Sequence, residues 1–293
     1  MGGDGFAPLP ARFRTISKPI MRFRLATWNI NSVRLRLDLV QRFVGAEQPD
    51  VLCLQEIKCQ EEQFPRAAFE AMGYPHIAVT GQKGYHGVAT VSKIPLTKMD
   101  RLDLCGDGHA RHVSVVLDDG STGRKPLTLH NFYVPAGGDI PDPVANAKFK
   151  HKLDFLDALT AWSGAHKTKA KNRLILVGDL NVAPLPTDVW SHKQLLKVVS
   201  HTPPETERMA QVLASHDWID VMRRHIPPED TLFTWWSYRN RDWRVSNRGR
   251  RLDHIWTTPA LDGAAVSMRV LQETRDWERT SDHVPVISDF ELD

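Results

Sequence analysis

Acidic, amide and imidazole side chains recur at the ends of apolar segments in this sequence. The positions are Asn29 and Asn31 on either side of Ile30, Glu56 after VLCLQ, Asp179 and Asn181 around the end of LILVGDL, Asp253 after Arg251–Leu252, and Asp282 with His283 before VPVI. Carboxylates are rarely buried unless they are paired or bind a metal. Because neighbouring strands end at the same edge of a sheet, we expect these side chains to line one concave site.

The oxygen-rich ligand set indicates a hard divalent cation. Magnesium uses one or two carboxylates and keeps several waters, and the pattern contains no thiolate that would select a softer metal. Glu56 is the predicted metal carboxylate, with Asn31 and Asp282 as supporting or water-mediated partners. Magnesium is the expected cofactor and manganese the alternative, with one ion or two and no small-molecule cofactor. Any one of these acids alone more often caps a helix or pairs with a base, so the prediction depends on the joint pattern.

His283 is singled out from 13 histidines by its place directly after Asp282 and before an apolar strand. An imidazole can hold a proton near neutral pH, especially where a carboxylate such as Asp253 orients its second nitrogen. His254 follows Asp253, but adjacent side chains in a strand point to opposite faces. We therefore expect His254 to lie outside the site.

Strands and helices must position these residues. Alternating or continuous apolar runs rich in β-branched residues predict strands at 22–30, 50–57, 87–93, 113–117, 127–134, 174–180, 252–257 and 284–292. Apolar residues three and four apart predict helices at 35–47, 146–162 and 205–216, and their stripes are interpreted as core. Several strands follow one another without a helix, which favours a pair of mixed sheets with helices outside them.

The composition fits one soluble globular domain. The chain has 293 residues, 41% of them apolar and 25% charged, and a net charge of +3 that does not by itself indicate nucleic acid. Three cysteines without a C-x-x-C pair argue against disulfides or a cysteine zinc site and favour the cytoplasm. No apolar run approaches the roughly 20 residues of a membrane helix. We expect one domain at 21–293, and at 1–20 a disordered extension, a misplaced start codon, a cloning remnant or a targeting peptide.

Basic and aromatic side chains alternate at residues 233–251, here called the 233–251 tract. Trp235, Trp236, Tyr238 and Trp243 stand there with six arginines. This combination suits phosphate contact together with stacking on bases or insertion at a gap. The predicted DNA contacts are Trp235, Tyr238, Arg239, Arg241, Trp243 and Arg248, and outside the tract Lys58 and Arg111. The competing interpretation is that at least one of the aromatic side chains packs beneath the tract.

Eight segments in the same order resemble the exonuclease III family of AP endonucleases. They are TWNINSVR (27–34), LCLQEIKC (52–59), YHGVATVSK (85–93), NFYVP (131–135), GDLNVAP (178–184), FTWWSYR (233–239), NRGRRLDHI (247–255) and SDHVPV (281–286). GDLN and SDH are shared with the wider endonuclease/exonuclease/phosphatase superfamily, whereas WNINSVR, LQEIKC and the 233–251 tract are more specific to DNA repair members.

The resemblance implies a four-layered α/β sandwich with two packed sheets. It implies a magnesium-dependent DNA repair nuclease that hydrolyses the phosphodiester 5′ to abasic sites in double-stranded DNA. Activity at 3′ ends, as 3′→5′ exonuclease and 3′ phosphatase or phosphodiesterase, is expected as well. The protein is expected to act as a monomer inside the cell, at the nucleoid.

The resemblance also assigns roles to single residues. By it, Glu56 is similar to the magnesium carboxylate, Asn29 and Asn31 to first-strand site residues, Tyr133 to the tyrosine on the scissile phosphate, Asp179 and Asn181 to the pair that activates water and orients phosphate, Asp253 and His283 to the carboxylate–imidazole pair, and Asp282 to the acid before that histidine. Whether Asp179 or His283 is the general base stays open at this point.

One segment departs from the family pattern. After Tyr133–Val134–Pro135, relatives carry Asn or Gln, whereas this chain has Ala136 followed by Gly137, Gly138 and Asp139. We expect the change to affect the grip on DNA, and with it the balance between abasic-site cutting and exonuclease activity.

Two other functions remain as alternatives. A superfamily phosphatase acting on lipid or inositol phosphates would have no use for the 233–251 tract. A non-catalytic DNA-binding module would be expected to lack some of the site residues, yet all of them are present.

Overall fold

The computed structural model describes residues 20–118, 120, 125–167, 172–240 and 242–293. The expectations for residues 1–19 and for Arg241 concern positions outside the described residues. Within the described ranges, no helix is both long enough and apolar enough to cross a bilayer.

Two six-stranded mixed sheets form the middle of the molecule. The first sheet has the order β13 (Ala265–Val270), β14 (Val286–Leu292), β1 (Met21–Asn29), β2 (Val51–Gln55), β4 (Val88–Ser92) and β3 (His76–Thr80). The second sheet has the order β5 (Leu96–Asp100), β6 (His112–Leu117), β7 (Leu127–Tyr133), β8 (Arg173–Asp179), β12 (Asp253–Thr257) and β9 (Ile219–Asp220). In each sheet one central pair is parallel, β1 with β2 and β7 with β8.

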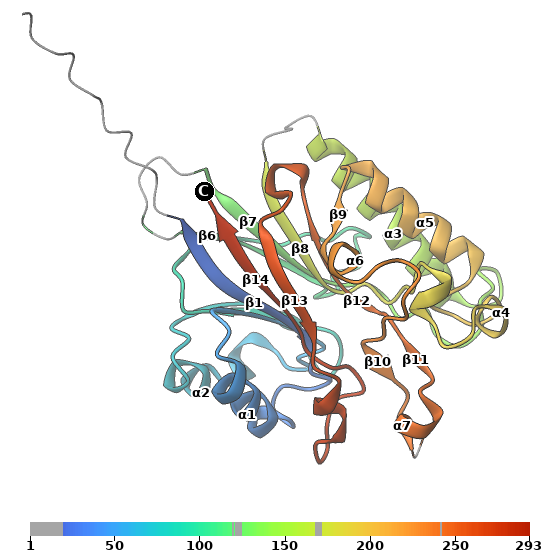
Figure 1. The fold of residues 1–293 in the computed structure, drawn as a ribbon, viewed down its shortest axis with the longest axis horizontal. Helices are drawn as coiled ribbons and strands as arrows, with labels where there is room; N and C mark the ends of the chain where they lie inside the picture. The colour runs from blue at the N-terminus through green and yellow to red at the C-terminus, as the bar shows by residue number, and fades with distance from the viewer. Residues whose placement is uncertain (1–19, 119, 121–124, 168–171, 241) are drawn as a thin grey trace, which may run out of the picture.

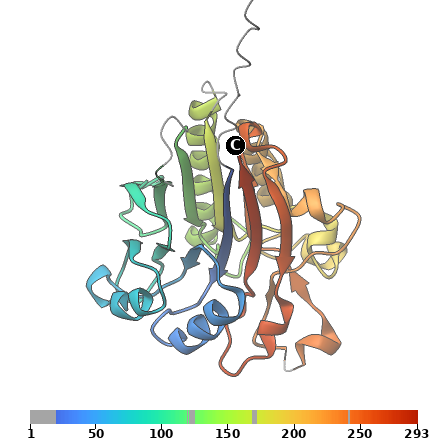
Figure 2. The same ribbon diagram turned by 60° about the vertical axis from the view of Figure 1, so that its left-hand side comes forward.

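Helices cover the outer faces of both sheets. The helices are α1 (Leu37–Glu47), α2 (Arg66–Ala71), α3 (Ala147–Lys167), α4 (His192–Leu195), α5 (Pro203–Ser215), α6 (Val221–His225) and α7 (Trp243–Ser246). Short 3-10 turns occur at Glu61–Gln63, Pro186–Asp188, Pro259–Leu261 and Gln272–Asp276. Figure 1 shows α3 and α5 side by side beyond the second sheet, with α1 and α2 on the opposite side of the molecule. The second view separates the same layers (Figure 2).

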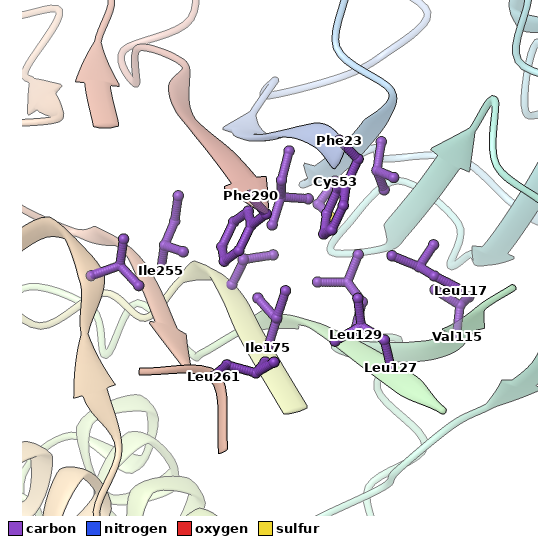
Figure 3. Packing of buried hydrophobic residues seen from close by; sticks show 14 of the residues in the cluster. Phe23, Cys53, Val115, Leu117, Leu127, Leu129, Ile175, Ile255, Leu261 and Phe290 are labelled. Atoms are coloured by element: carbon purple, nitrogen blue, oxygen red, sulfur yellow. The ribbon is translucent and has the colours of Figure 1, made fainter. Parts of the chain in front are cut away.

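Three apolar clusters explain this layering. Phe23 and Leu25 of β1 face inward and pack with Leu129 of β7 and Ile175 of β8 between the sheets, and Figure 3 shows side chains of both sheets meeting there. The alternate residue Trp28 points outward, onto α1. A third cluster joins α3 and α5 to the outer face of the second sheet. Burial of two faces per sheet accounts for the nearly continuous apolar runs in β2 and β8.

A small ribbon extends from this sandwich. β10 (Trp235–Trp236) and β11 (Gly249–Arg250) pair antiparallel, and α7 lies between them in the sequence. Figure 1 shows this ribbon projecting beyond the sheets on the side of α4. The 233–251 tract therefore forms a structure of its own beside the sandwich.

The predicted four-layered α/β sandwich is confirmed, and so are the predicted strands and helices to within a few residues at their ends. Three longer strands were missed: β3, β5 and β13. In β5 and β13 most residues are exposed or half-buried, because these strands lie at sheet edges and lack a regular apolar alternation.

Candidate active site

Strand register brings the predicted acids together. Tyr133 of β7 pairs with Asp179 of β8, which pairs in turn with Asp253 of β12. On the first sheet, Asn29 at the end of β1 pairs with Gln55, directly before Glu56. The strand ends of both sheets therefore meet at one end of the sandwich, as their positions in the sequence predicted.

Several site residues have left-handed backbone conformations. Asn31 (φ 48°), Glu56 (φ 48°), Lys58 (φ 51°) and Asn181 (φ 55°) all lie in this region although each carries a Cβ. Such conformations cost on the order of 1–2 kcal/mol per residue and collect at functional sites. Each turns the chain sharply at a strand end and directs polar side chains back toward the neighbouring strand. The sequence gives no signal for this beyond the residue types.

We use the name strand-end cluster for Asn29, Glu56, Asp179, Asp253 and His283. Asn29 is buried, and its Nδ2 donates to Asp179 Oδ2 at 2.8 Å and to Glu56 Oε1 at 3.0 Å. The Tyr133 hydroxyl donates to the same Glu56 oxygen at 2.9 Å. One amide thus joins the carboxylates contributed by the two sheets.

His283 lies between two carboxylates. Its Nδ1 is 2.8 Å from Asp253 Oδ2 and its Nε2 is 3.6 Å from Asp179 Oδ2. Burial disfavours the charged imidazole, but the nearby carboxylates of Asp253 and Asp179 outweigh it and raise the pKa of His283 well above its usual range. The two carboxylates therefore favour the charged form of the imidazole, and Asp253 fixes its orientation.

Asp179 is buried beside a second amide. Asn181 donates its backbone N–H to Asp179 Oδ1 at 3.0 Å and its side-chain amide to Asp179 Oδ2 and to the Val134 carbonyl. Burial raises the pKa of Asp179, although the His283 charge and the Asn29 hydrogen bond oppose that rise. A carboxyl with a pKa moved toward neutrality is suited to accept a proton.

A second group of polar contacts surrounds Glu56. Lys58 Nζ lies 2.8 Å from Glu56 Oε2 and also donates to the Asn31 side chain. Asn31 donates to Asp282 Oδ1 at 3.2 Å, and the Trp235 indole donates to Asp282 Oδ2 at 2.9 Å. Burial opposes ionisation of Glu56, yet the Lys58 charge and the Asn29 hydrogen bond lower its pKa. The three predicted metal residues thus belong to one network of polar contacts.

A buried ion pair supports the loops that carry these residues. Lys152 of α3 and Glu205 of α5 are fully buried and paired, and Lys152 Nζ also donates to the carbonyls of Asn181 at 2.7 Å and Ala136 at 3.3 Å. Glu205 accepts the backbone N–H of Ser200. Lys152 was not among the residues predicted from the sequence. Its position next to Leu153, in the apolar stripe of a predicted helix, could have indicated that it is buried.

A pocket of about 580 Å³ opens beside the strand-end cluster. Among its lining residues are Glu56, Asn181, Asp282, His283, Trp190, Trp235, Arg239, Arg248 and Arg250. Ala136, Gly138 and Asp139 line it as well, so the departure from the family pattern lies at the site itself. Acids and amides therefore share one pocket with Trp235 and three arginines of the 233–251 tract, and with Trp190 from outside the tract. A larger cavity lies elsewhere, against β6, β7 and the start of β8, and contains none of the predicted site residues.

The base of the 233–251 tract is joined to the His283 segment. Trp235 and His283 form an antiparallel bridge. Val284 N–H donates to the Thr234 carbonyl, and Trp236 N–H donates to the Asp282 carbonyl, both at 2.9 Å. The ribbon and the imidazole are therefore parts of one hydrogen-bonded ladder.

The described arginines of the tract differ in their partners, and Arg250 is held by hydrogen bonds to the Val199 carbonyl and Ser200 Oγ. Arg251 is buried and pairs with Asp188 and Asp220, and Arg244 pairs with Asp276. Arg239 and Arg248 have no ion pair within the described part of the chain, and Arg248 lies 4.7 Å over the Trp190 ring. Arg239 and Arg248 are thus the described arginines best placed to meet a phosphate.

The other predicted DNA contacts differ in exposure. Tyr238 is 48% exposed, whereas Trp243 is 9% exposed, packs on Trp236 and donates its indole N–H to Asp276. Arg111 is buried, with its guanidinium 5.1 Å over the Tyr133 ring. His254, expected outside the site, directs Nε2 to the Val182 carbonyl. Little of Trp243 or Arg111 remains free to contact DNA in this arrangement.

Comparison with known proteins identifies relatives along most of the chain. The model of the endonuclease/exonuclease/phosphatase family matches residues 26–283. Exodeoxyribonuclease III of Haemophilus influenzae is 30% identical over 91% of this chain and 99% of its own length.

Two solved structures share the fold closely. The 3′ phosphatase NExo from Neisseria, bound to a product DNA hairpin, is 32% identical with a TM-score of 0.81, over 92% of this chain and 99% of that one. An AP endonuclease from Archaeoglobus fulgidus is 29% identical with a TM-score of 0.81, over the same shares.

Proposed function

This chain belongs to the endonuclease/exonuclease/phosphatase family, in its exonuclease III branch, and on that premise we propose that it is a DNA repair nuclease. It hydrolyses the phosphodiester 5′ to abasic sites in double-stranded DNA and also acts at 3′ ends. This proposal rests on the pocket that Asn181 and His283, the neighbours of Asp179, help to line. Arginines and tryptophans line the same pocket, and they suit a nucleic acid better than a lipid. We further propose that residues 21–293 form one catalytic domain, which acts as a monomer inside the cell.

The geometry favours Asp179 as the general base. Asp253 and Asp179 raise the pKa of His283 and so favour its charged form, which suits a positive charge beside the phosphate better than a proton acceptor. Asp179 accepts the proton of the attacking water, whose oxygen bonds to phosphorus as the bond to the 3′ oxygen breaks. The departing 3′ oxygen takes a proton from a second water and leaves as a hydroxyl. Asn181 and Tyr133 are assigned as hydrogen-bond donors to the non-bridging oxygens, to which they turn from their present acceptors Asp179 and Glu56 when the phosphate is bound.

Magnesium is the proposed cofactor, with manganese able to replace it. Glu56 and Asp282 line the same pocket and offer carboxylate oxygens, and Asn31 adds an amide oxygen. This donor set fits a hard cation. When bound, the ion supplies positive charge to the phosphate oxygens. We expect EDTA to abolish nicking and magnesium to restore it, and Glu56→Ala to lose most of the turnover while keeping the fold. Full activity of Glu56→Ala at ordinary magnesium would contradict its assignment as a ligand.

A nicking assay tests the function directly. Labelled duplex oligonucleotides with one abasic site, without one, or with a 3′ phosphate are incubated with magnesium, alongside an inositol polyphosphate assayed for phosphate release. We expect a cut 5′ to the abasic site and loss of the 3′ phosphate, with Asp179→Asn as the inactive control. Release from inositol polyphosphate without any DNA cleavage would instead support the phosphatase alternative.

A further inference from the structure

A second group of potential metal ligands lies outside the strand-end cluster. Asp107, His109 and His151 each place a ligand atom within 4.8 Å of the others. Asp107 and His109 belong to the loop between β5 and β6, and His151 belongs to the beginning of α3. Their side chains are 28%, 32% and 25% exposed, so the group is accessible to an ion from solvent yet partly enclosed.

The contacts within this group are unlike those of an ordinary ion pair. His109 Nδ1 and His151 Nε2 approach the same oxygen, Asp107 Oδ2, at 2.9 and 2.6 Å. Both nitrogens are buried. One carboxylate oxygen thus faces two buried imidazole nitrogens at close range.

The loop that presents two of the ligands is held firmly. The Asp103 carboxylate accepts backbone N–H groups from Gly106 at 2.9 Å, Asp107 at 3.2 Å and Gly108 at 2.9 Å. These backbone hydrogen bonds lower the pKa of Asp103. Asp107 Oδ1 in turn accepts the N–H of His109 at 2.9 Å, which leaves Oδ2 for the imidazoles. The ligand geometry is thus set by the loop before any ion arrives.

We propose that Asp107, His109 and His151 form a metal site distinct from the proposed magnesium site, which takes zinc or a similar dication that prefers imidazole. Two imidazole nitrogens and one carboxylate oxygen match the three protein ligands of many zinc sites, with water in the fourth position. Zinc bonds of about 2.0–2.1 Å in a tetrahedron place ligand atoms about 3.3 Å apart, so the two nitrogens would have to move away from Asp107 Oδ2 by about 0.4 Å and about 0.7 Å from their present 2.9 and 2.6 Å.

The surroundings of His151 favour the form of the imidazole that binds metal. Burial lowers the pKa of His151, and the Arg111 charge adds to that, while Asp107 opposes it. A neutral imidazole offers its lone pair to the ion. The ion would connect the 103–109 loop to α3 at His151. The residue after His151, Lys152, donates a hydrogen bond to the Asn181 carbonyl. The site therefore braces the helix that supports the strand-end cluster.

Zinc binding to the full chain tests this proposal. After removal of metals, wild type, His151→Gln and the double variant His109→Gln/His151→Gln are titrated with zinc chloride by calorimetry in excess magnesium. His166→Gln, on the same helix and bonded to the Trp162 carbonyl, is the matched control. Circular dichroism and nicking activity in magnesium verify that each variant is folded. Cobalt substituted for zinc gives a visible absorption band that reports the coordination directly.

The expected result is one more bound zinc per chain in wild type and His166→Gln than in the double variant. His151→Gln is expected to weaken this site by about tenfold or more. Zinc should raise the Tm of wild type but not that of the double variant. Equal zinc stoichiometry and equal cobalt spectra in wild type and the double variant would overturn the proposal. That result would leave the proposed nuclease function untouched, because magnesium-dependent nicking is measured separately.

Discussion

The strand-end cluster and the 233–251 tract contribute to the same pocket but are built differently. In the cluster, buried polar side chains hold one another, as when Asn29 donates to both Asp179 and Glu56. In the tract, arginines lie over aromatic rings, as Arg248 does over Trp190, and several guanidiniums remain in contact with solvent. Catalysis requires that the reacting side chains are held in a fixed geometry, whereas binding of a polyanion requires positive charges that are not already paired. Changes in the cluster should affect kcat, and changes in the tract should affect affinity.

Substitutions in the strand-end cluster are expected to have the largest effect. Asp179→Asn and His283→Asn should each lower kcat on abasic DNA by about 10²- to 10⁴-fold, with Kd for DNA nearly unchanged. The double variant should lose less than the product of the two, because the groups act on one phosphate. Single-turnover kinetics and a binding assay measure the two quantities. Asp157→Asn, an exposed acid on α3, is the control. A loss of DNA affinity as large as the loss of kcat would show that the strand-end cluster also determines DNA binding, and would contradict the proposed division of roles between the cluster and the 233–251 tract.

The support beneath the cluster gives the next largest effect. Lys152→Met leaves Glu205 buried without its partner, which typically costs about 3–5 kcal/mol of folding free energy. Urea unfolding measures this loss, and Lys152→Met/Glu205→Met should recover part of it. Lys150→Met, at an exposed pair with Asp154, should cost little. Equal stability of Lys152→Met and Lys150→Met would mean that the buried pair does not hold the Asn181 loop.

The pH profile refines the role of the cluster. Burial raises the pKa of Asp179 to about 7. Since only the ionised carboxylate can accept a proton, kcat should fall about tenfold per pH unit below that value. His283, whose pKa the neighbouring carboxylates raise, stays charged well above neutrality and contributes no loss on the acid side. A kcat that is flat from pH 5 to pH 8, with chemistry rate-limiting, would remove Asp179 from the role of base.

The smallest effects belong to the tract. Arg239→Ala and Arg248→Ala should each weaken DNA binding and reduce its salt dependence by about 0.9 log units per decade of salt, with kcat retained. Arg244→Ala is the matched control, because its guanidinium is paired with Asp276. Binding isotherms at several salt concentrations measure the slope. If Arg244→Ala changed the slope as much as Arg248→Ala, the division of the tract into paired and free arginines would be incorrect.

The sequence predicted those site residues and strands whose structure depends on the local pattern of apolar and polar residues. Asp179 and Asn181 could be found because a buried strand ends in polar residues, and the register with Asp253 then follows from the sheet. The left-handed turn at Glu56 could not be found, since nothing in residue type alone requires it. Edge strands such as β5 were not predicted, because their exposed residues show no regular alternation of apolar and polar side chains.

The tract shows a different limit. Six arginines look alike in the sequence, yet Arg251 is neutralised by Asp188, 63 residues away, and Arg244 by Asp276, 32 residues away. Partners at such separations are set by tertiary structure. The same reasoning applies to Trp243, whose indole is occupied by Asp276. Composition therefore predicted a basic, aromatic surface but not which of its members face outward.

The bridge between Trp235 and His283 has a mechanical consequence. Because the ribbon's first strand and the histidine segment share ladder hydrogen bonds, they move as one body, and a force applied to the ribbon reaches the imidazole without passing through a flexible joint. A contact that displaces the ribbon therefore acts directly on the backbone that carries the imidazole.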